Sequence, residues 1–515
     1  MDSRSRAALP PFGTTIRDLL LDGAGTDPDH VLLIAGDRRI TLAQLADHTR
    51  AVAADLAERG IRPGDAVATM LGNGPNHVAV FLGVALAGAL WVPLSPEAKG
   101  PSLAHALAVA RPKLAFATGE ACQRLREAGL NEACILIETD GWALPDRSAP
   151  PPDIPAHKAK PDEARAILFT SGTSGPPKGV TVTERMLVAS AAGTAIASDC
   201  HAGDVYLMWE PLHHIGGSQI VVMALARLVQ LVVVERFSAS ALWPQVRANG
   251  VTKLHYLGGI LEILLKAAPR PDDRHHPLRL AFGGGCRPEV WRAFEERFAV
   301  PLREVYGMTE ASSFTTINMN GTVGSVGTPV PWFSVSLAGN DGRPVPEGGI
   351  GEIVVSSDHP ELFTPGYLGA PEATAKLLRD GCLFTGDLGR FDAAGNLQYV
   401  GRLTDSLRRR GENVSAWEVE TALGSHPDIA ECAVVGIPAE IGEHEIMCFL
   451  SMRDGAAFDP AALAAWCTRQ MPRHHVPRFW KQVAGFERTP SQRIRKDLLD
   501  RGRGDAIDTG DGRPL

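Results

Sequence analysis

The segment FTSGTSGPPKGV, from Phe169 to Val180, brings together hydroxyl side chains, glycines, a proline pair and one lysine. Glycine lets backbone N–H groups approach a ligand closely, hydroxyls donate hydrogen bonds to phosphate oxygens, and Lys178 adds positive charge. The segment therefore predicts a loop that binds a polyanion. It is not a Walker loop, because Lys178 is followed by Gly179 and the strand-like sequence VTVT rather than by Ser or Thr at the start of a helix.

Composition narrows the class of protein. The chain has 515 residues, 44% hydrophobic and 21% charged, which is typical of a globular protein with two or more domains. Its 51 basic and 59 acidic residues give a net charge of −8, and no block of Lys or Arg appears, so nucleic acid is not an expected partner. Eight scattered cysteines without a C-x-x-C pair favour reduced thiols and a cytoplasmic location.

Neither export nor membrane insertion is expected. The N-terminal sequence MDSRSRAALPPFG lacks the apolar region of a signal peptide. The most apolar run, IVVMALARLVQLVVV, is interrupted by Arg227 and is short for a membrane span.

Helical and strand patterns alternate through most of the chain. ITLAQLADHTRAVAADLAERGI repeats apolar residues at helical spacing, and the strand-like DAVATML and the apolar helix HVAVFLGVALAGAL follow it. The alternation continues through a helix predicted from Glu184 to about Ala197 and through the strand-like LVVVERF and KLHYLGG. This pattern predicts a layered α/β architecture.

Two changes of pattern indicate further units. SVSLAGNDGRPVPEGGIGEIVVSS predicts a small β subdomain before residue 400. After GRLTD the pattern restarts as an α+β unit, with the helices WEVETALGS and PAALAAWCTRQ and the strands CAVVGIP and EIMCFLSM. We therefore expect a large domain over residues 1–402 and a small C-terminal α+β domain over residues 403–515.

Five further motifs follow the phosphate loop in order: AFGGGCRPEVW, REVYGMTEAS, LFTGDLGRFDAAGNLQYVGR, DSLRRRGENVSAWEVE and ERTPSQRIRK. Together these six motifs resemble the adenylate-forming superfamily of acyl-CoA synthetases, peptide-synthetase adenylation domains and luciferases, over nearly the whole chain. Each motif alone is weak, but six in order make coincidence very improbable. ERFSASALWPQVRANGVTKLHYLGG and RRRGENVSAWEVE look most like the crotonobetaine/carnitine CoA ligase branch.

The resemblance implies a reaction in two steps. A carboxylic acid is first joined to AMP with release of pyrophosphate, and a thiol then attacks the activated carbonyl. ATP, Mg²⁺ and coenzyme A are therefore the implied cofactors and co-substrates. Both steps move charge on phosphates or oxyanions, which positioned donors and Mg²⁺ stabilise.

The resemblance also implies roles for the nucleotide-binding residues. Tyr306 would stack on adenine, Asp387 would accept hydrogen bonds from the ribose hydroxyls, and Arg402 would contact ribose or phosphate where the hinge begins. Glycines would leave a flat slot beside the adenine at Gly283, Gly284 and Gly285. The phosphate loop would surround the β- and γ-phosphates through Thr170, Ser171, Gly172, Thr173, Ser174, Gly175 and Lys178.

The same resemblance assigns the groups nearest the reaction. Thr309 would donate to the α-phosphate and Glu310 would bind Mg²⁺ through a hard oxygen ligand. His214, in WEPLHHIGG, would gate the acid pocket, with Gly216 and Gly217 keeping the backbone close to the substrate. Other plausible pocket residues are Trp209, Leu257, Gly258 and Met308.

Each of these residues also has a plainer interpretation. Thr309 and Glu310 together could be an N-cap and a first-turn acid. Tyr306 could be a core residue, Asp387 part of an Asx-turn, Arg402 a solvated arginine and His214 a structural histidine.

In this family the small domain swings about the hinge and presents different groups to the two steps. In the second pose the loop RRRGENVS would line the pantetheine tunnel, and Gly411, Glu412 and Asn413 fit that role, although a plain connecting turn is the alternative. The hinge carries Thr404 where Asp or Lys is common. Where the family usually has Gly-Lys before an aliphatic residue, this chain has Gln492, then Arg493.

Arg493 retains the positive charge but replaces a compact ammonium with a planar fork, so the geometry of its contacts changes. Arg495 or Lys496 are alternative sources of that charge.

Three functions are compared. The leading one is an ATP- and Mg²⁺-dependent acid–CoA ligase that acts on a small-molecule acid, as a monomer or homodimer. The second is a natural-product enzyme that loads an aryl acid onto a carrier protein, or that activates nitrite for diazotisation of an arylamine. The third is a nucleotide-binding regulator that has lost its chemistry, which only Arg493 supports. An amino-acid adenylation domain is disfavoured, because WEPLHHIGG lacks an initial Asp to hold an α-ammonium.

Overall fold

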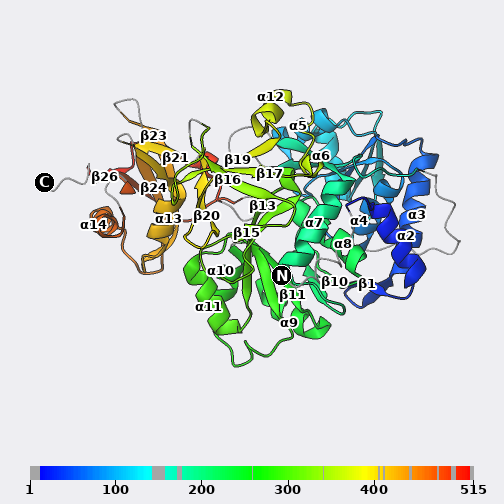
Figure 1. Ribbon diagram of the computed structural model, residues 1–515, viewed down its shortest axis with the longest axis horizontal. Coiled ribbons are helices and arrows are strands. Elements are labelled where there is room, and N and C mark those ends of the chain that lie inside the picture. Colours follow the sequence, from blue (N-terminus) through cyan, green and yellow to red (C-terminus); the bar gives the residue numbers. More distant parts are fainter. Residues whose placement is uncertain are drawn as a thin grey trace.

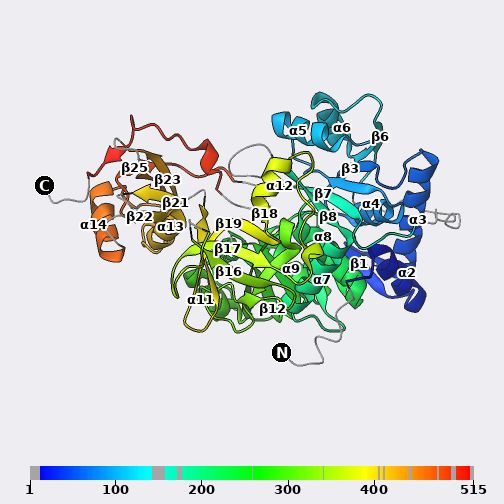
Figure 2. The same cartoon turned by 45° about the horizontal axis from the view of Figure 1, so that its top comes forward.

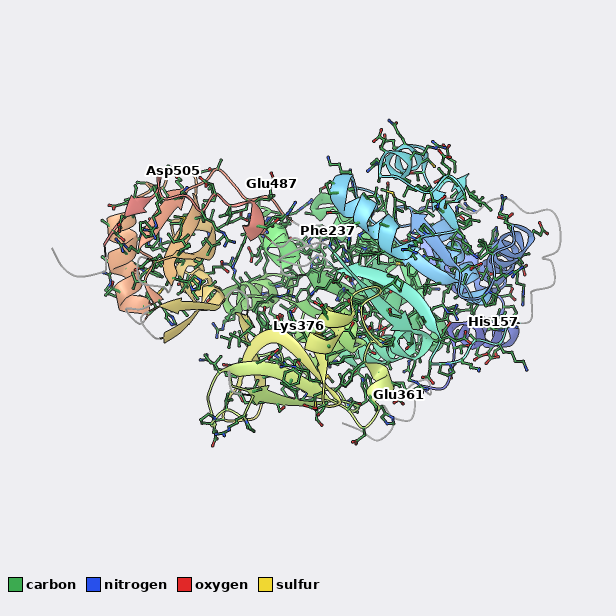
Figure 3. All side chains as sticks on the ribbon, turned by 90° about the horizontal axis from the view of Figure 1, so that it is seen from above. His157, Phe237, Glu361, Lys376, Glu487 and Asp505 are labelled. Carbon is green, nitrogen blue, oxygen red and sulfur yellow. The ribbon has the colours of Figure 1, made fainter. Side chains whose placement is uncertain are left out.

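The computed structural model describes residues 12–141, 157–170, 177–257, 259–339, 342–403, 406–409, 412–439, 444–471, 475–488 and 494–510. A large body contains three sheets, and a smaller lobe formed by the residues after about 405 lies beside it (Figure 1). In Figure 3, Glu487 lies on the side of the small lobe that is turned toward the body, and Asp505 lies farther out. No helix among the described residues is long and apolar enough to cross a membrane.

The first sheet of the body has the strand order β6-β5-β3-β4-β7-β8. Neighbouring strands from β6 to β7 are parallel, and β8 returns antiparallel to β7. The central strands are fully buried apolar runs, as expected for a parallel sheet covered by helices on both faces. Its strands are β3 (Ala66–Met70), β4 (Leu90–Pro93), β5 (Leu114–Ala117), β6 (Ile135–Glu138), β7 (Ala164–Thr170) and β8 (Lys178–Thr183).

Helices of the first half of the chain accompany this sheet (Figure 2). Every residue of α4 is buried, which explains why its sequence is apolar on all sides. Thr41 and Gln44 form a capping box at the start of α3. The helices are α2 (Ile16–Thr26), α3 (Leu42–Glu58), α4 (Pro75–Leu86), α5 (Gly100–Ala110) and α6 (Gly119–Glu127).

The second sheet has nine strands in the order β15-β14-β13-β12-β11-β9-β10-β1-β2. The strands from β1 through β10, β9, β11 and β12 to β13 are parallel neighbours. Its strands are β1 (Val31–Ala35), β2 (Arg38–Thr41), β9 (Val205–Met208), β10 (Gln230–Val233), β11 (Lys253–Leu257), β12 (Leu280–Gly284), β13 (Leu302–Met308), β14 (Ser313–Ile317) and β15 (Thr328–Pro329).

The helix predicted from Glu184 to about Ala197 is confirmed as α7 (Glu184–Ala197). It packs against α8 (Ile215–Arg227), which is also almost wholly buried. The remaining helices of this part are α9 (Ala239–Asn249), α10 (Gly259–Lys266), α11 (Pro288–Phe298) and the 3₁₀ turn η1 (Thr309–Ala311).

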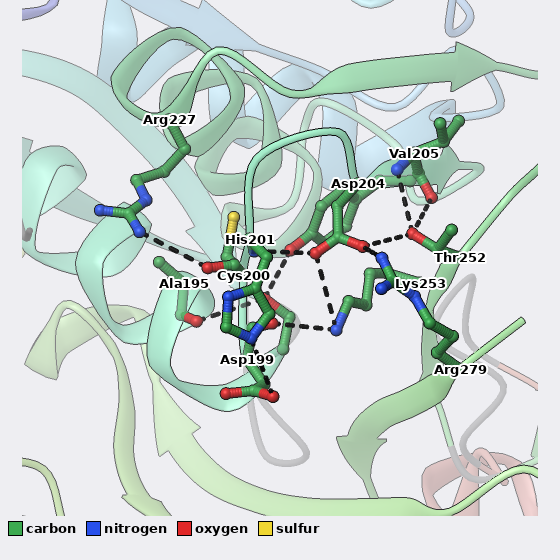
Figure 4. Close-up of polar contacts among 12 residues, drawn as sticks. Ala195, Asp199, Cys200, His201, Asp204, Val205, Arg227, Thr252, Lys253 and Arg279 are labelled. Atoms are coloured by element: carbon green, nitrogen blue, oxygen red, sulfur yellow. Dashed lines mark hydrogen bonds and ion pairs between the residues drawn. The ribbon is translucent and has the colours of Figure 1, made fainter. Parts of the chain in front are cut away.

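Buried charges tie the amino-terminal ends of β9, β11 and β12 together (Figure 4). The carboxylate of Asp204, which is fully buried, accepts from Thr252 Oγ1 at 2.6 Å and from the backbone N–H of His201 at 2.8 Å. It also pairs with Arg279, and Lys253 Nζ lies 3.7 Å away. Because ligands of open α/β sheets bind at the carboxyl ends of the strands, this cluster is structural and lies at the opposite edge from the candidate site.

The predicted small β subdomain is confirmed as a third sheet. It has the strand order β16-β17-β19-β18, and β20 pairs antiparallel with the second half of β19. It contains β16 (Ser334–Ala338), β17 (Gly351–Ser356), β18 (Leu378–Arg379), β19 (Cys382–Phe391) and β20 (Leu397–Arg402), with η2 (Pro360–Leu362) and α12 (Pro371–Leu377) alongside.

The small lobe has its own apolar core. Two clusters of buried residues, which include Val414, Cys448 and Trp480, draw only on residues from Leu407 onward. Its elements are β21 (Ser406–Arg409), β22 (Glu412–Ser415), α13 (Ala416–Gly424), β23 (Ile429–Pro438), β24 (His444–Met452), α14 (Pro460–Gln470), β25 (Phe479–Gln482), η5 (Lys496–Leu498) and β26 (Ile507–Asp508). The predicted α+β pattern is therefore confirmed, and the boundary at residues 402 and 403 stays a prediction.

Candidate active site

Strand β8 places Lys178 beside a segment from a distant part of the chain. Val180 forms a bridge with Tyr367, the N–H of Leu368 donates to Gly179 O at 2.8 Å, and the N–H of Thr181 donates to Gly366 O at 3.1 Å. This pairing brings the ammonium of Lys178 to 5.1 Å from the ring centroid of Tyr367, a cation–π distance. Lys178 is thus the first residue of the strand that follows the predicted phosphate loop, and its ammonium group lies beside Tyr367.

Glu310 lies next to this pair. It follows the carboxyl end of β13, its side chain is 5% exposed, and Tyr367 Oη donates to its Oε1 at 2.7 Å. Burial raises the pKa of Glu310, while the hydrogen bond from Tyr367 and the charges of Arg402 and Lys178 oppose that shift. The carboxylate of Glu310 is a hard oxygen donor of the kind that Mg²⁺ prefers, and the two cations favour its ionised form.

A second carboxylate lies between β13 and the third sheet. Tyr306 Oη donates to Asp387 Oδ2 at 2.8 Å, and Arg402 Nε lies 3.3 Å from Asp387 Oδ1. Asp387 is 5% exposed, whereas the side chain of Arg402 is 36% exposed and so reaches solvent. The ring centroids of Tyr306 and Tyr399 are 6.0 Å apart. Three predicted residues, which come from two separate motifs, therefore meet in one contact group.

Glycines are required where β12 ends. A Cβ at Gly283 would lie 1.9 Å from Tyr256 O, and one at Gly284 would lie 3.1 Å from Val305 O. Gly285 adopts φ +87°, a conformation that other residues rarely take. The neighbouring strands themselves therefore demand these glycines, and the flat adenine slot stays a prediction.

His214 occupies the N-cap position of α8 and makes no side-chain capping bond. Its ring lies 4.4 Å from the ring of His213, whose pKa is held well below its usual value, mainly by burial. The room beside Gly216 is taken by the carboxylate of Glu210, and that beside Gly217 by the carbonyl of Pro211. These two glycines therefore have a packing reason within the turn itself.

A model of the AMP-binding enzyme family matches residues 21–368, and a model of the AMP-binding enzyme C-terminal domain matches residues 418–493. The chain belongs to the AMP-binding enzyme family. The sulfoacetate–CoA ligase of Cupriavidus necator is 33% identical, over 95% of this chain and 97% of the relative. The crotonobetaine/carnitine–CoA ligase of Salmonella arizonae is 30% identical, over 95% of this chain and 99% of the relative.

The crystal structure of ATP-bound MatB from Rhodopseudomonas palustris has the same fold, with a TM-score of 0.85 over 94% of this chain and 98% of that chain at 22% identity. The expected resemblance and fold class are thus confirmed. This AMP-binding enzyme is an adenylate-forming enzyme of the acid–CoA ligase type.

Two plainer interpretations of the AMP-binding motifs are wrong. Thr309 is not an N-cap, because η1 begins at Thr309 and Met308 occupies the cap position, whereas the other half of that interpretation is confirmed, since Glu310 is an acid in the first turn. Asp387 is not in an Asx-turn, because it lies within β19 and pairs with Arg402 across β20.

Several predicted site residues of the AMP-binding enzyme lie at the limits of the described part of the chain or outside it. Thr170 ends β7, with its hydroxyl 3.4 Å from Lys178 O. Glu412 begins β22, and only its backbone is described. Residues outside the described part of the chain are Ser171, Gly172, Thr173, Ser174, Gly175, Gly258, Thr404, Gly411 and Arg493.

Two residues of this site were missed by the sequence reasoning. Tyr367 lies in TPGYLG, which carries no recognised motif, and only its pairing with β8 reveals its contact with Glu310. Glu304 lies two residues before Tyr306, and its carboxylate accepts from the turn after β12. A charged residue in an otherwise buried strand was the available signal for Glu304.

Proposed function

We propose that the protein activates a carboxylic acid with ATP as an acyl-adenylate, releases pyrophosphate, and transfers the acyl group to coenzyme A. The observation that carries this proposal is that Lys178, Glu310, Asp387 and Arg402, which come from three separate motifs, lie close together beyond the carboxyl end of β13. Membership of the AMP-binding enzyme family already identifies the protein as an adenylate-forming enzyme. Coenzyme A as the acceptor and the class of acid are what we propose here.

The nucleoside of ATP would be bound by the contact group around Asp387. Its Oδ2 accepts from Tyr306 and its Oδ1 lies beside Arg402, so the carboxylate is held in one orientation and retains lone pairs for the ribose hydroxyls. Tyr306 would contact adenine beside Gly283, Gly284 and Gly285. Arg402 is half-exposed and would turn toward ribose or phosphate.

The triphosphate would be bound by the loop between β7 and β8. Lys178 supplies the charge, Thr309 would donate to the α-phosphate, and Thr170 with Ser171, Gly172, Thr173, Ser174 and Gly175 would supply hydroxyl and backbone donors. These positioned donors would stabilise charge that develops on the phosphates as the carboxylate attacks.

Glu310 fits the role of a Mg²⁺ ligand. Among the described residues, no group of three or more His, Cys, Asp or Glu side chains could hold a metal ion. Mg²⁺ is commonly bound by one or two carboxylates together with substrate phosphates, so a single buried Glu suffices. The ion would neutralise phosphate charge.

The second step would use the small domain, with a boundary at residues 402 and 403. Arg493 would approach the carboxylate and α-phosphate in one pose, and Gly411 and Glu412 would line the passage for pantetheine in the other. His214 would gate the acid pocket. Acids that carry a second charged group are the favoured substrates, since both ligases compared above are named for such acids.

Pyrophosphate release tests this proposal. Purified protein would be given ATP and Mg²⁺ with sulfoacetate, carnitine, aliphatic or aryl acids, each with and without coenzyme A. Acid-dependent release with thioester formation is expected. Release with nitrite and an arylamine, transfer only to a carrier protein, or ATP binding without release would each contradict it.

A further inference from the structure

The carboxylate of Glu304 lies under the turn that follows β12. Its Oε1 accepts from the backbone N–H of Gly285 at 2.5 Å and from the N–H of Cys286 at 2.9 Å. Its Oε2 accepts from Tyr256 Oη at 2.7 Å. The side chain of Glu304, on β13, therefore connects Tyr256 near the end of β11 with the turn that follows β12.

This arrangement fixes a turn that its own backbone does not hold. Gly285 has φ +87°, in the left-handed region, and consecutive N–H groups point to a single oxygen. A carboxyl oxygen accepts hydrogen bonds from N–H groups whether the group is ionised or protonated. Without this acceptor two buried donors would need new partners, and the turn would lose its defined position.

The chain retains this carboxylate although its position is unfavourable for a charge. Glu304 is 5% exposed, and within the described part of the chain its side chain accepts from Gly285, Cys286 and Tyr256 and forms no ion pair with Lys, Arg or His. Burying an unpaired carboxylate costs free energy that a Gln at the same position would avoid. The feature of this side chain that matters for the turn is therefore the oxygen that accepts from its two N–H groups, which a Gln could also supply.

The turn is next to the predicted nucleotide contacts. Gly285 directly follows Gly283 and Gly284. Glu304 precedes Tyr306 by two residues on β13, so the side chains of Glu304 and Tyr306 lie on the same face of the sheet. Glu304 is itself covered by Tyr256 and the turn, so it acts through the backbone.

We propose that Glu304 is a positioning residue for ATP, which holds the Gly283–Gly285 turn at the place where the adenine end of the nucleotide binds. The proposal rests on the proposed adenylation function. It assigns to Glu304 a share of ATP affinity and no share in the chemical step.

Three variants separate positioning from stability. Glu304→Gln keeps a carbonyl oxygen that can accept from the two N–H groups. Its amide nitrogen can donate to Tyr256 Oη, and the hydroxyl of Tyr256 can in turn donate to Arg303 O, which lies 3.3 Å away. Glu304→Leu removes both acceptors. Tyr256→Phe removes a hydrogen bond from the same carboxylate but leaves the contacts with the turn, so it is the matched control for destabilisation.

The readouts are the equilibrium Kd of ATP without acid, the KM for ATP, kcat, and the midpoint of thermal unfolding. Glu304→Leu is expected to raise Kd and KM about 10-fold or more while kcat changes less than about 3-fold, as for a loss of ground-state and transition-state binding alike. Glu304→Gln and Tyr256→Phe should keep Kd within about 3-fold of the wild type.

An unchanged ATP Kd in Glu304→Leu would overturn the proposal, as would equal losses of affinity in Glu304→Leu and Tyr256→Phe. If Glu304→Leu does not fold, Glu304→Asp replaces it, because its shorter side chain withdraws the carboxylate from the turn and should weaken ATP binding. Since the ATP Kd is measured without acid, wild-type protein that binds ATP but releases no pyrophosphate would reject the adenylation function and leave this test intact.

Discussion

Asp387 Oδ1 lies 3.3 Å from Arg402 Nε, and the two residues are directly paired across β19 and β20. The other oxygen of Asp387 accepts from Tyr306 at the end of β13. This carboxylate therefore connects β19 of the third sheet, β13 of the second sheet and Arg402 at the end of β20, where the proposed function puts the nucleoside.

Asp387→Asn tests the nucleotide contact. The amide replaces one acceptor oxygen with a donor, so it can no longer accept from two ribose hydroxyls, and we expect the KM for ATP to rise about 10-fold or more. Arg390→Ala is the matched control, because Arg390 is exposed on the same strand and bonds only Gln398 among the described residues. Equal KM values for Asp387→Asn and the control would reject the role of Asp387.

Glu310→Gln tests the metal contact. The substitution keeps an oxygen that can accept from Tyr367 but removes the charge that Mg²⁺ requires, so the Mg²⁺ concentration for half-maximal activity should rise about 10-fold or more. Tyr367→Phe retains the carboxylate and should change this concentration by less than about 3-fold. Identical Mg²⁺ titrations for wild type and Glu310→Gln would show that Glu310 is not a ligand.

A buried ion pair between the start of β7 and the start of α7 should contribute to stability. Arg165 Nε lies 2.5 Å from Glu184 Oε1, and both side chains are 0% exposed. Glu184→Gln removes the closer carboxylate and leaves Glu163, at 3.4 Å, as the partner of the guanidinium, so it should lower the free energy of unfolding by about 2–3 kcal/mol, measured by denaturant titration. Asp55→Asn breaks the exposed pair with Arg59 and should change it by less than about 1 kcal/mol. Similar values for the two variants would contradict this assignment.

The pH dependence of stability should reveal Glu304. Burial raises the pKa of Glu304 to about 7 from an ordinary value of 4.5. Between these two pH values the folded state retains a proton that the unfolded chain has already lost. The free energy of unfolding therefore falls as pH rises from about 4.5 to about 7, by at most about 3 kcal/mol from this group. Glu304→Gln lacks this loss, so it should become more stable relative to wild type as pH rises. A pH-independent difference between the two proteins would contradict the shifted pKa.

Short-range patterns in the sequence predicted the fold well. The helix from Glu184 to Ala197 has its predicted bounds, and the strand after the phosphate loop begins at Lys178 itself. Both follow from local patterns, namely a hydrophobic helix after a Thr cap and a run of β-branched residues.

Contacts between distant segments were not predictable in the same way. Motifs identified Asp387, Arg402 and Tyr306 one by one, but the sharing of one carboxylate depends on the pairing of β19 with β20 and on the approach of β13. Tyr367 was missed because its role depends on a bridge to Val180, far away in sequence. Gly216 was assigned to substrate approach, whereas its nearest neighbour is the carboxylate of Glu210.

The most direct test of the central claim is acid-dependent exchange of labelled pyrophosphate into ATP in the absence of coenzyme A. Exchange requires reversible formation of an acyl-adenylate, and the thiol plays no part in it. The account predicts exchange with at least one acid of the panel in the wild type and a loss of at least about 10-fold in Lys178→Ala, which lacks the charge beside the phosphates. Wild-type protein that binds ATP and Mg²⁺ but shows no exchange with any acid would contradict the account.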